Sequence, residues 1–188
     1  MAKMGPGPQL HIVVRDCSWV GGFLENINPD FVCSSDPTHH LPNGGYNCIA
    51  WAAGKKDAWW WPRNEPGVEW PRGLPFEEIN RETLINFINA FRTVGYIKCK
   101  DGRFENGIEK VAIFVGPLNT PTHAARSLEN GVWTSKLGNG EDIEHKTLSE
   151  IEGKEYGKAV AFMKRRFDRK PFLLERIRSI FNRSSCFA

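Results

Sequence analysis

The segment "THAARSLENGVWTSKLG" (residues 122–138) decides how the second half of the chain folds. Two strand-like runs flank Asn130 and Gly131, and an Asn-Gly pair between such runs is the strongest short signal for a β-hairpin. We therefore predict strands over residues 122–128 and 132–138. How these strands pair decides which side chains share a face with His123.

Two registers are compatible with this turn. A two-residue type I′ loop pairs residues 129 and 132, and it places His123 on one face with Thr134 and Lys136. A three-residue loop with a G1 bulge pairs residues 128 and 132 instead. His123 then faces Leu137, and Ser135 lies diagonal to it on the same face. The sequence leaves both registers open.

The segments upstream and downstream of this hairpin complete the fold class. The run "EKVAIFVG" (109–116) is typical of a buried strand, and residues 156–165 fit either a strand or the start of a helix. In "NRETLINFINAFRTVG" (80–95) the apolar residues have helical spacing, with Asn80 as the candidate N-cap and Gly95 as the stop. Helices in the first half and an antiparallel sheet in the second predict an α+β fold.

The length of 188 residues allows one domain with a hydrophobic core. We predict a flexible leader over residues 1–9, a domain over 10–165 and a basic amphipathic helix over 166–188. Residues 164–188 carry eight Lys or Arg against two acidic residues, whereas the rest carries 17 against 20. We interpret the tail as a helix that docks its apolar side on the domain, so we expect no nucleic-acid partner.

The sequence contains no signal for a membrane or for secretion. No apolar run approaches the roughly 18 residues that a membrane span needs. The N-terminal residues "MAKMGPGPQL" lack the apolar region of a signal peptide. We therefore expect a cytoplasmic protein without a membrane span, whose export needs a signal-independent route.

Five cysteines, at positions 17, 33, 48, 99 and 186, form an odd set without a C-x-x-C pair. This pattern favours reduced thiols over a disulfide framework. The spacings of Cys33, His39, His40 and Cys48 match no common zinc motif. We expect neither a metal nor another cofactor.

Cys48 lies in "YNCIAWAAG" (46–54), after a glycine-rich loop and at the start of an apolar helix. A helix N-terminus beside a histidine stabilises a thiolate and so activates a cysteine as a nucleophile. Backbone N–H groups at this helix start, together with the Asn47 side chain, are candidates for an oxyanion hole. The alternative is that Cys48 is a small buried hydrophobic residue.

A histidine on a later strand completes the chain order of Cys-His hydrolases, and His123 is the candidate. We expect it at a sheet edge beside a cleft, where it holds the Cys48 thiolate as an ion pair. The third group, which orients the imidazole, is Ser135 if the hairpin has a bulge, or Asp142 if the chain after the hairpin folds back. We interpret His145 as a surface or helix-capping residue; the alternative is that it orients a group near the site.

Residues 57–75 hold four tryptophans among four prolines, a density of proline that opposes regular structure. We predict an ordered loop whose tryptophans form a small core of their own. Trp61 from this loop, Tyr46 and Asn47 are the candidates for contacts with the substrate.

"YNCIAWA" resembles the "YDCSGL" nucleophile segment of NlpC-type cell-wall peptidases. "HAARSLENGVWTSKLG" is similar to their histidine strand, hairpin and following strand, with Ser135 at their third polar position. The assembly from about residue 44 to 165 more closely resembles a bacterial domain family of unknown function. The resemblance implies a papain-like (NlpC-like) core, in which a nucleophile helix packs on an antiparallel sheet, with Cys48 and His123 as catalytic residues. Asn47 replaces the Asp of the NlpC pattern, so the substrate contacts differ.

These observations predict a cysteine-dependent amide hydrolase (a peptidase, amidase or deamidase) that acts on a protein or peptide. Family habit adds the expectation of a secreted effector or toxin. One alternative is acyl transfer of the transglutaminase type, which uses the same Cys-His chemistry. Another is a non-catalytic binding or immunity module on the same scaffold.

Overall fold

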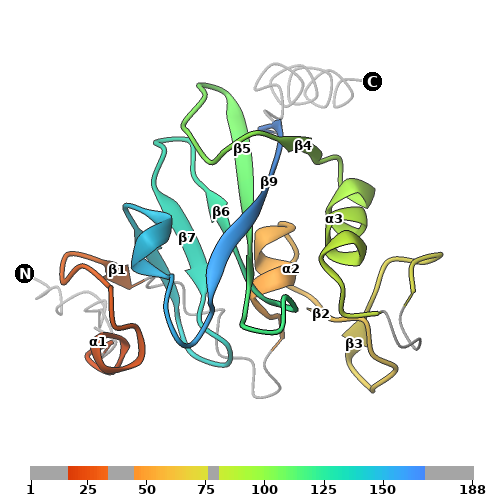
Figure 1. Ribbon diagram of the computed structural model, residues 1–188, viewed down its shortest axis with the longest axis horizontal. Coiled ribbons are helices and arrows are strands. Elements are labelled where there is room, and N and C mark those ends of the chain that lie inside the picture. The colour runs from red at the N-terminus through yellow and green to blue at the C-terminus, as the bar shows by residue number, and fades with distance from the viewer. Residues whose placement is uncertain (1–16, 34–44, 76–80, 168–188) are drawn as a thin grey trace, which may run out of the picture.

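The centre of the fold is an antiparallel sheet that the second half of the chain builds (Figure 1). The structure, a computed structural model, describes residues 17–33, 45–75 and 81–167. Within these ranges, seven strands pair in the order β1-β8-β7-β6-β5-β9-β4, and every pair is antiparallel. The prediction of a mixed α and β fold is confirmed at this level: a large antiparallel sheet with few helices.

The helices and strands have the following bounds. The helices are α1 (Val20–Phe23), α2 (Cys48–Ala52), α3 (Leu84–Thr93) and a short 3₁₀ helix, η2 (Leu148–Glu150). The strands of the large sheet are β1 (Val32–Cys33), β4 (Ile97–Cys99), β5 (Ile108–Val115), β6 (Pro121–Ser127), β7 (Trp133–Lys136), β8 (Asp142–His145) and β9 (Lys158–Arg166). A separate pair consists of β2 (Trp59–Trp60) and β3 (Val68–Glu69).

The large sheet carries a hydrophobic core on each face. Side chains alternate along β5, so Val111 and Ile113 join the core under α2 and α3, while Ala112 and Phe114 join the core on the opposite face, with α1. Figure 1 shows α2 and α3 on one side of the sheet and α1 on the other. Because both faces are covered, the central strand β5 reads as a nearly continuous apolar run.

The two helices that pack on one face begin and end at the residues that local chemistry favours. The Asn47 side chain accepts a hydrogen bond from the N–H of Ala50 and so caps α2. The Thr83 side chain accepts from the N–H of Asn86 and caps α3. The predicted stop at Gly95 is confirmed, because this residue follows the helix with a φ of 89°. The predicted cap, Asn80, lies outside the described residues.

The hairpin between β6 and β7 has the register with the bulge. The N–H of Leu128 donates to the carbonyl of Val132, and Ser127 pairs with Trp133. Gly131 has a φ of 84°, the left-handed conformation that the third loop residue needs. The two-residue alternative is therefore wrong. Residues 156–165, left open between strand and helix, contribute to β9, the long neighbour of β5.

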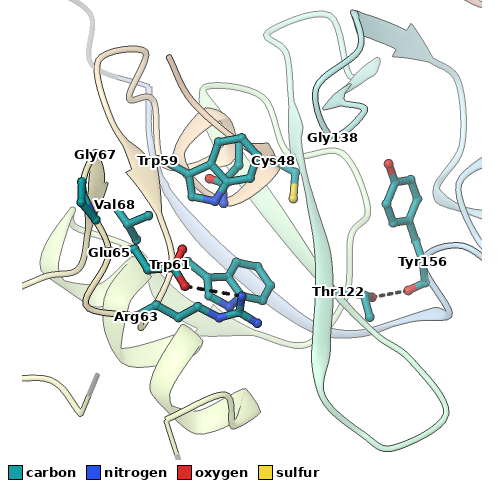
Figure 2. A pocket seen from close by; sticks show the side chains of 12 residues that line it. Cys48, Trp59, Trp61, Arg63, Glu65, Gly67, Val68, Thr122, Gly138 and Tyr156 are labelled. Atoms are coloured by element: carbon teal, nitrogen blue, oxygen red, sulfur yellow. Dashed lines mark hydrogen bonds and ion pairs between the residues drawn. The ribbon is translucent and has the colours of Figure 1, made fainter. Parts of the chain in front are cut away.

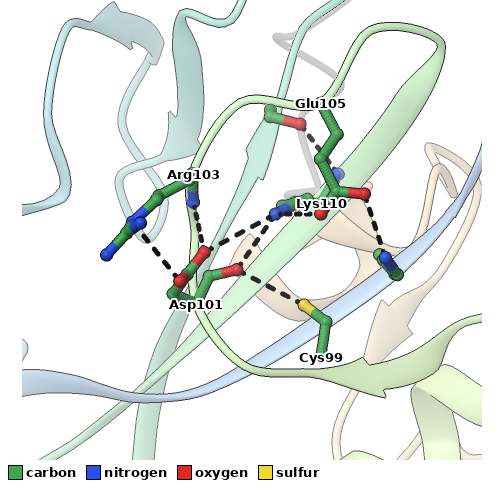
Figure 3. A network of polar contacts seen from close by, with 7 residues as sticks. Cys99, Asp101, Arg103, Glu105 and Lys110 are labelled. Carbon is green, nitrogen blue, oxygen red and sulfur yellow. Dashed lines mark hydrogen bonds and ion pairs between the residues drawn. The ribbon is translucent and has the colours of Figure 1, made fainter.

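A buried lysine fixes the loop that leads into β5 (Figure 3). Lys110 is 2% exposed, and its Nζ lies 2.8 Å from the carboxylate of Glu105 and 3.1 Å from the carbonyl of Asp101. Lys164 of β9 donates to the same Glu105 at 2.9 Å. The Cys99 thiol also contacts this loop, at the Asp101 carbonyl. These contacts are on the end of the sheet that carries β4 and are structural.

Two expectations from the sequence need correction, and others fall outside the structure. Cys17 and Cys33 form a disulfide, which joins the segment before α1 to the edge strand β1, so these two thiols are not reduced. The tryptophan loop is not wholly irregular, since β2 and β3 pair in parallel within it. The leader over residues 1–9, His39, His40 and the basic tail beyond residue 167 lie outside the described residues. Within the described ranges, no helix is long and apolar enough to cross a membrane.

Candidate functional site

A cleft of about 790 Å³ opens where α2 begins (Figure 2). Cys48 lies between its two walls, with Trp59 and Trp61 on one side and Thr122 and Tyr156 on the other. The lining is completed by Asn47, Arg63, Glu65, Pro66, Gly67, Val68 and Gly138. The cleft therefore brings together the start of the helix, the tryptophan loop and the ends of β6 and β9.

The Cys48 thiol is close to backbone N–H groups but is poorly hydrated. The residue is 7% exposed, and burial raises the pKa of its thiol to about 11. Backbone hydrogen bonds from Ala124 of β6 and from Ile49 oppose this rise, as does the positive charge of Lys136. Desolvation outweighs these contacts, so Cys48 is a neutral thiol at pH 7.

Asn47 holds the start of α2 to the tryptophan loop. Its side-chain oxygen accepts from the N–H groups of Ala50 and Trp60, and its amide donates to the Trp60 carbonyl at 2.8 Å. The side chain is buried, and these three bonds engage both its oxygen and its amide group. These bonds position the wall of the cleft, and Asn47, which is expected to contribute to an oxyanion hole, is among the residues that line it.

The tryptophan wall, which consists of Trp59 and Trp61, is held in place by contacts of Trp61 with neighbouring side chains. Trp61 packs edge-on against Phe87 of α3, with ring centroids 5.2 Å apart, and its indole N–H donates to Glu82. Arg63 binds the same carboxylate oxygen at 3.2 Å. Trp61 lines the cleft as predicted for a substrate contact, and Trp59 lies beside it. Trp60, by contrast, points into the core under α2.

His123 lies on β6, between β5 and β7 in the strand order. It pairs with Phe114 of β5, whereas β7 pairs with β6 further along, at Arg126 and Ser127. The imidazole is fully buried against Phe114 and Tyr156. Within the part of the chain that the structure describes, His123 is not among the residues that line the cleft. The ring of Tyr156, which does line it, stacks on the imidazole.

The Nε2 atom of His123 belongs to a buried chain of hydrogen bonds. This atom lies 3.1 Å from Ser135 Oγ, and Ser135 Oγ lies 3.0 Å from His145 Nε2. His145 Nδ1 in turn lies 2.8 Å from the carbonyl of Thr147. His145 is 1% exposed, so its interpretation as a surface or capping residue is wrong. The bulged register is what brings Ser135 to His123.

Both histidines are neutral in this arrangement. Burial, and to a smaller extent the neighbouring His145, lower the pKa of His123 to about 3. Burial likewise lowers the pKa of His145 to about 4. Since Cys48 is also neutral, the expected thiolate–imidazolium ion pair does not form at rest. The Nδ1 atom of His123 has no hydrogen-bond partner in the structure.

Cys48 and His123 approach the same residues without a hydrogen bond between them. The backbone of Ala124, the residue after His123, bonds the Cys48 sulfur. Tyr156 contacts the imidazole directly. Burial raises the pKa of its phenol, and the nearby Cys48 adds to this rise. The thiol therefore lies beside the backbone of the residue that follows His123, and Tyr156 is close to both the thiol and the imidazole.

The remaining candidates, Asp142 and Tyr46, bind each other. The Tyr46 hydroxyl donates to the Asp142 carboxylate at 2.8 Å, and its ring stacks on Trp51. Asp142 pairs with Lys136, one position along from Ser135, so it belongs to the opposite face of the sheet from Ser135. Of the two candidates for the third group, the structure brings Ser135 to His123. Tyr46 is buried, and the residues that line the cleft do not include it within the described ranges.

The sequence argument does not count two residues of the site, His145 and Tyr156, among the catalytic candidates. The signal for His145 is periodicity, since a strand over residues 142–145 paired with β7 places His145 opposite Trp133 and on the face of Ser135. Tyr156 follows from no local pattern. It sits in a loop that the paired Gly153 and Gly157 close through two backbone hydrogen bonds. In the described ranges, no group of three His, Cys, Asp or Glu could hold a metal ion.

Comparison with known proteins shows a match to a family model. The family model described as "Domain of unknown function (DUF7689)" matches residues 38–164, a range that contains the cleft, the histidine chain and most of the sheet. No curated protein and no solved structure matches the chain.

Proposed function

The chain belongs to the domain family of unknown function DUF7689, and we propose that it is a cysteine-dependent amide hydrolase with a papain-like core. Cys48 is the nucleophile, His123 is the general base and acid, and Ser135 orients the imidazole. The substrate is a protein or peptide amide that binds between the tryptophan wall and Tyr156. No cofactor takes part in the reaction.

One observation carries the proposal, the unpartnered Nδ1 of His123. A buried imidazole nitrogen normally finds a hydrogen-bond partner, and one without a partner is available to accept a proton. This atom belongs to the residue next to Ala124, whose backbone bonds the Cys48 sulfur. The other imidazole nitrogen is held by Ser135, as an orienting group requires.

The reaction is an ordinary acyl transfer through a thioester. The proton of the Cys48 thiol moves to His123 Nδ1 as the sulfur bonds the carbonyl carbon of the amide. The oxyanion accepts hydrogen bonds from backbone N–H groups at the start of α2. Collapse breaks the C–N bond, and the departing amine takes the proton from Nδ1. Water then attacks the thioester by the same route and releases the acid and the thiol.

The resting arrangement needs one change before this chemistry. The pKa of Cys48 lies far above that of His123, so proton transfer between them is strongly unfavourable while both are dry. Displacement of the Tyr156 ring from His123 would admit water or substrate to the imidazole and reduce the difference between the pKa values of Cys48 and His123. We place that displacement before the attack of the sulfur.

The proposal is tested by covalent capture of Cys48. In a Cys99→Ser, Cys186→Ser background, Cys48 is the one cysteine outside the disulfide. We expect a peptide-like vinyl sulfone to label Cys48 at neutral pH, and His123→Ala to slow labelling roughly 10²-fold, the lower range of general-base catalysis. Asn89→Ala, on the surface of α3, is a control that should label like the parent. Equal labelling of the His123→Ala variant and the parent would contradict the proposal.

Acyl transfer to an amine instead of water would use the same atoms. Release of ammonia from a glutamine-containing peptide, measured with and without an added primary amine, separates the two reactions. If the added amine is incorporated into the peptide, the chain is a transferase of the transglutaminase type.

A second candidate function is a ligand-binding module without turnover. The neutral thiol and the covered imidazole favour it, because neither group is activated at rest. A module of this kind would show a Cys48 labelling rate that rises only as the thiol ionises in alkaline solution, and that rate would not depend on His123.

A further inference from the structure

We infer that His145 is a positioning residue that fixes, through Ser135, which nitrogen of His123 carries the proton. This inference rests on the proposed function, because it assigns to His145 the role of keeping the catalytic nitrogen, His123 Nδ1, unprotonated. It concerns one continuous chain of groups, from the Thr147 carbonyl to His123 Nδ1.

The direction of each hydrogen bond follows from the one group in the chain that cannot donate. A backbone carbonyl only accepts, so the 2.8 Å contact with Thr147 requires a proton on His145 Nδ1. A neutral imidazole has one N–H, which leaves His145 Nε2 as a lone pair. The single hydroxyl proton of Ser135 is then donated to His145 Nε2 across 3.0 Å.

The same reasoning fixes His123. Once the Ser135 hydroxyl has donated to His145, its oxygen can only accept from His123 across the 3.1 Å contact. His123 must therefore carry its proton on Nε2. Its Nδ1 is left as a bare lone pair, which agrees with the absence of a partner for that atom in the structure. The proposed function assigns the role of proton acceptor to this lone pair.

Burial protects this arrangement from water. His123 and Ser135 are fully buried, and His145 is 1% exposed. The Glu150 carboxylate, whose charge acts on His145, is bound by the N–H and hydroxyl of Thr147. The proton positions are therefore set by the Thr147 carbonyl alone, two residues after His145.

Removing the acceptor at His145 should reverse the direction of the hydrogen bond between Ser135 and His123. In His145→Phe, the Ser135 hydroxyl loses its partner, and the nearest remaining acceptor is His123 Nε2. A buried hydroxyl without a partner is unfavourable, so Ser135 turns to donate there and His123 shifts its proton to Nδ1. In His145→Gln, the side-chain oxygen takes the position of Nε2 and accepts from Ser135. His123 then keeps its proton on Nε2.

The test uses ¹⁵N chemical shifts of the imidazole nitrogens in histidine-labelled full-length protein, which distinguish protonated from bare nitrogen. In the parent protein we expect His123 with N–H at Nε2 and His145 with N–H at Nδ1. We expect His145→Phe to shift the tautomer ratio of His123 about tenfold or more toward Nδ1–H, and His145→Gln to retain the parent ratio. A purely structural role for His145 would affect both variants alike and would leave the tautomer unchanged.

The parent spectrum alone can overturn the inference, even if the Phe variant does not fold. A proton on Nδ1 of His123, or a doubly protonated His145, contradicts the chain of donors. The vinyl sulfone labelling of Cys48 is a separate readout. If His123 has its proton on Nε2 and Cys48 stays unlabelled, the proposed function fails and the tautomer assignment stands. If His123 carries Nδ1–H and Cys48 is labelled, His145 has no positioning role.

Discussion

The rings of Tyr156 and His123 stack with their centroids 4.1 Å apart and their planes 26° from parallel. The Tyr156 ring also lines the cleft, so one side chain contacts both the imidazole and the space that a substrate would enter. Its neighbour Gly157 has a φ of 74° and lies so close to the Val115 carbonyl that a Cβ would collide with it. The loop that carries Tyr156 is thus seated tightly on β5.

Replacing Tyr156 by alanine should expose His123. Desolvation is the largest cause of the low pKa of this imidazole, and removal of the stacked ring admits water. We expect the pKa of His123 to rise from about 3 toward its ordinary value of 6.5. An NMR titration of the histidine ring measures the change. Tyr156→Phe retains the ring and should titrate as the parent does; an unchanged titration of the alanine variant would show that other residues keep the imidazole dry.

The two buried histidines should lower the free energy of unfolding at acidic pH. Their pKa values in the folded protein, about 3 for His123 and about 4 for His145, lie below the unfolded value of 6.5, so the unfolded chain binds more protons between these limits. The stabilisation is complete above about pH 6.5 and is lost as the pH falls toward 4 and then 3, by up to about 1.4 kcal/mol per pH unit for each histidine.

Urea unfolding at about pH 5 and pH 7 measures this dependence. Between these values, we expect the free energy of unfolding of His123→Gln, His145→Gln to vary less with pH than that of the parent. The surface variant Lys146→Gln, next to His145 in sequence, should retain the parent slope. Parallel pH profiles for the double variant and the parent would refute the assignment of two neutral buried histidines.

Asn47 should be worth more to stability than an ordinary helix cap. Asn47→Ala removes the cap of α2 and leaves the Trp60 N–H and carbonyl without partners, so we expect a loss of about 3 kcal/mol. Thr83→Ala removes only the cap of α3 and should cost about 1 kcal/mol. Asn47→Asp retains the two accepted bonds but sets a carboxylate oxygen against the Trp60 carbonyl, so its loss should be intermediate. Equal losses for Asn47→Ala and Thr83→Ala, measured by denaturant unfolding, would argue against the link to the tryptophan loop.

The bulged turn should depend on Gly131. Gly131→Ala forces a side chain into a φ of 84° and sets a Cβ 3.0 Å from the Phe104 ring. Gly73→Ala is a matched control, because Gly73 has a φ of 81° and open space around its Cβ position. We expect a loss of about 1–2 kcal/mol at Gly73 from conformation alone and a larger loss at Gly131. Thermal unfolding compares the two, and a smaller loss at Gly131 would mean that the turn relaxes to another register.

The sequence predicts most of the secondary structure around the site, because periodicity and turn chemistry are local. The Asn130-Gly131 turn, the apolar run of β5 and the stop at Gly95 each follow from a few neighbouring residues. The choice of register is different. Both loops satisfy Asn-Gly, and only the packing of the whole face selects the one that brings Ser135 to His123.

The misses have a common physical cause, since each depends on how the strands pair and pack. His145 reads as a surface residue until β8 is paired with β7, which places it opposite Trp133. His123 reads as a residue beside a cleft until Phe114 and Tyr156 are packed against its ring. The spacing of Cys17 and Cys33 carries no signal of pairing, and their contact arises because β1 joins the sheet beside β8.

The disulfide between Cys17 and Cys33 and the free thiol of Cys48 impose opposite requirements on any solution in which the protein is handled. A reductant strong enough to keep a thiol available also attacks the bond that ties the N-terminal segment to the sheet. An oxidant that preserves that bond exposes the sulfur in the cleft to modification. Redox buffer composition is therefore an experimental variable as important for this protein as pH.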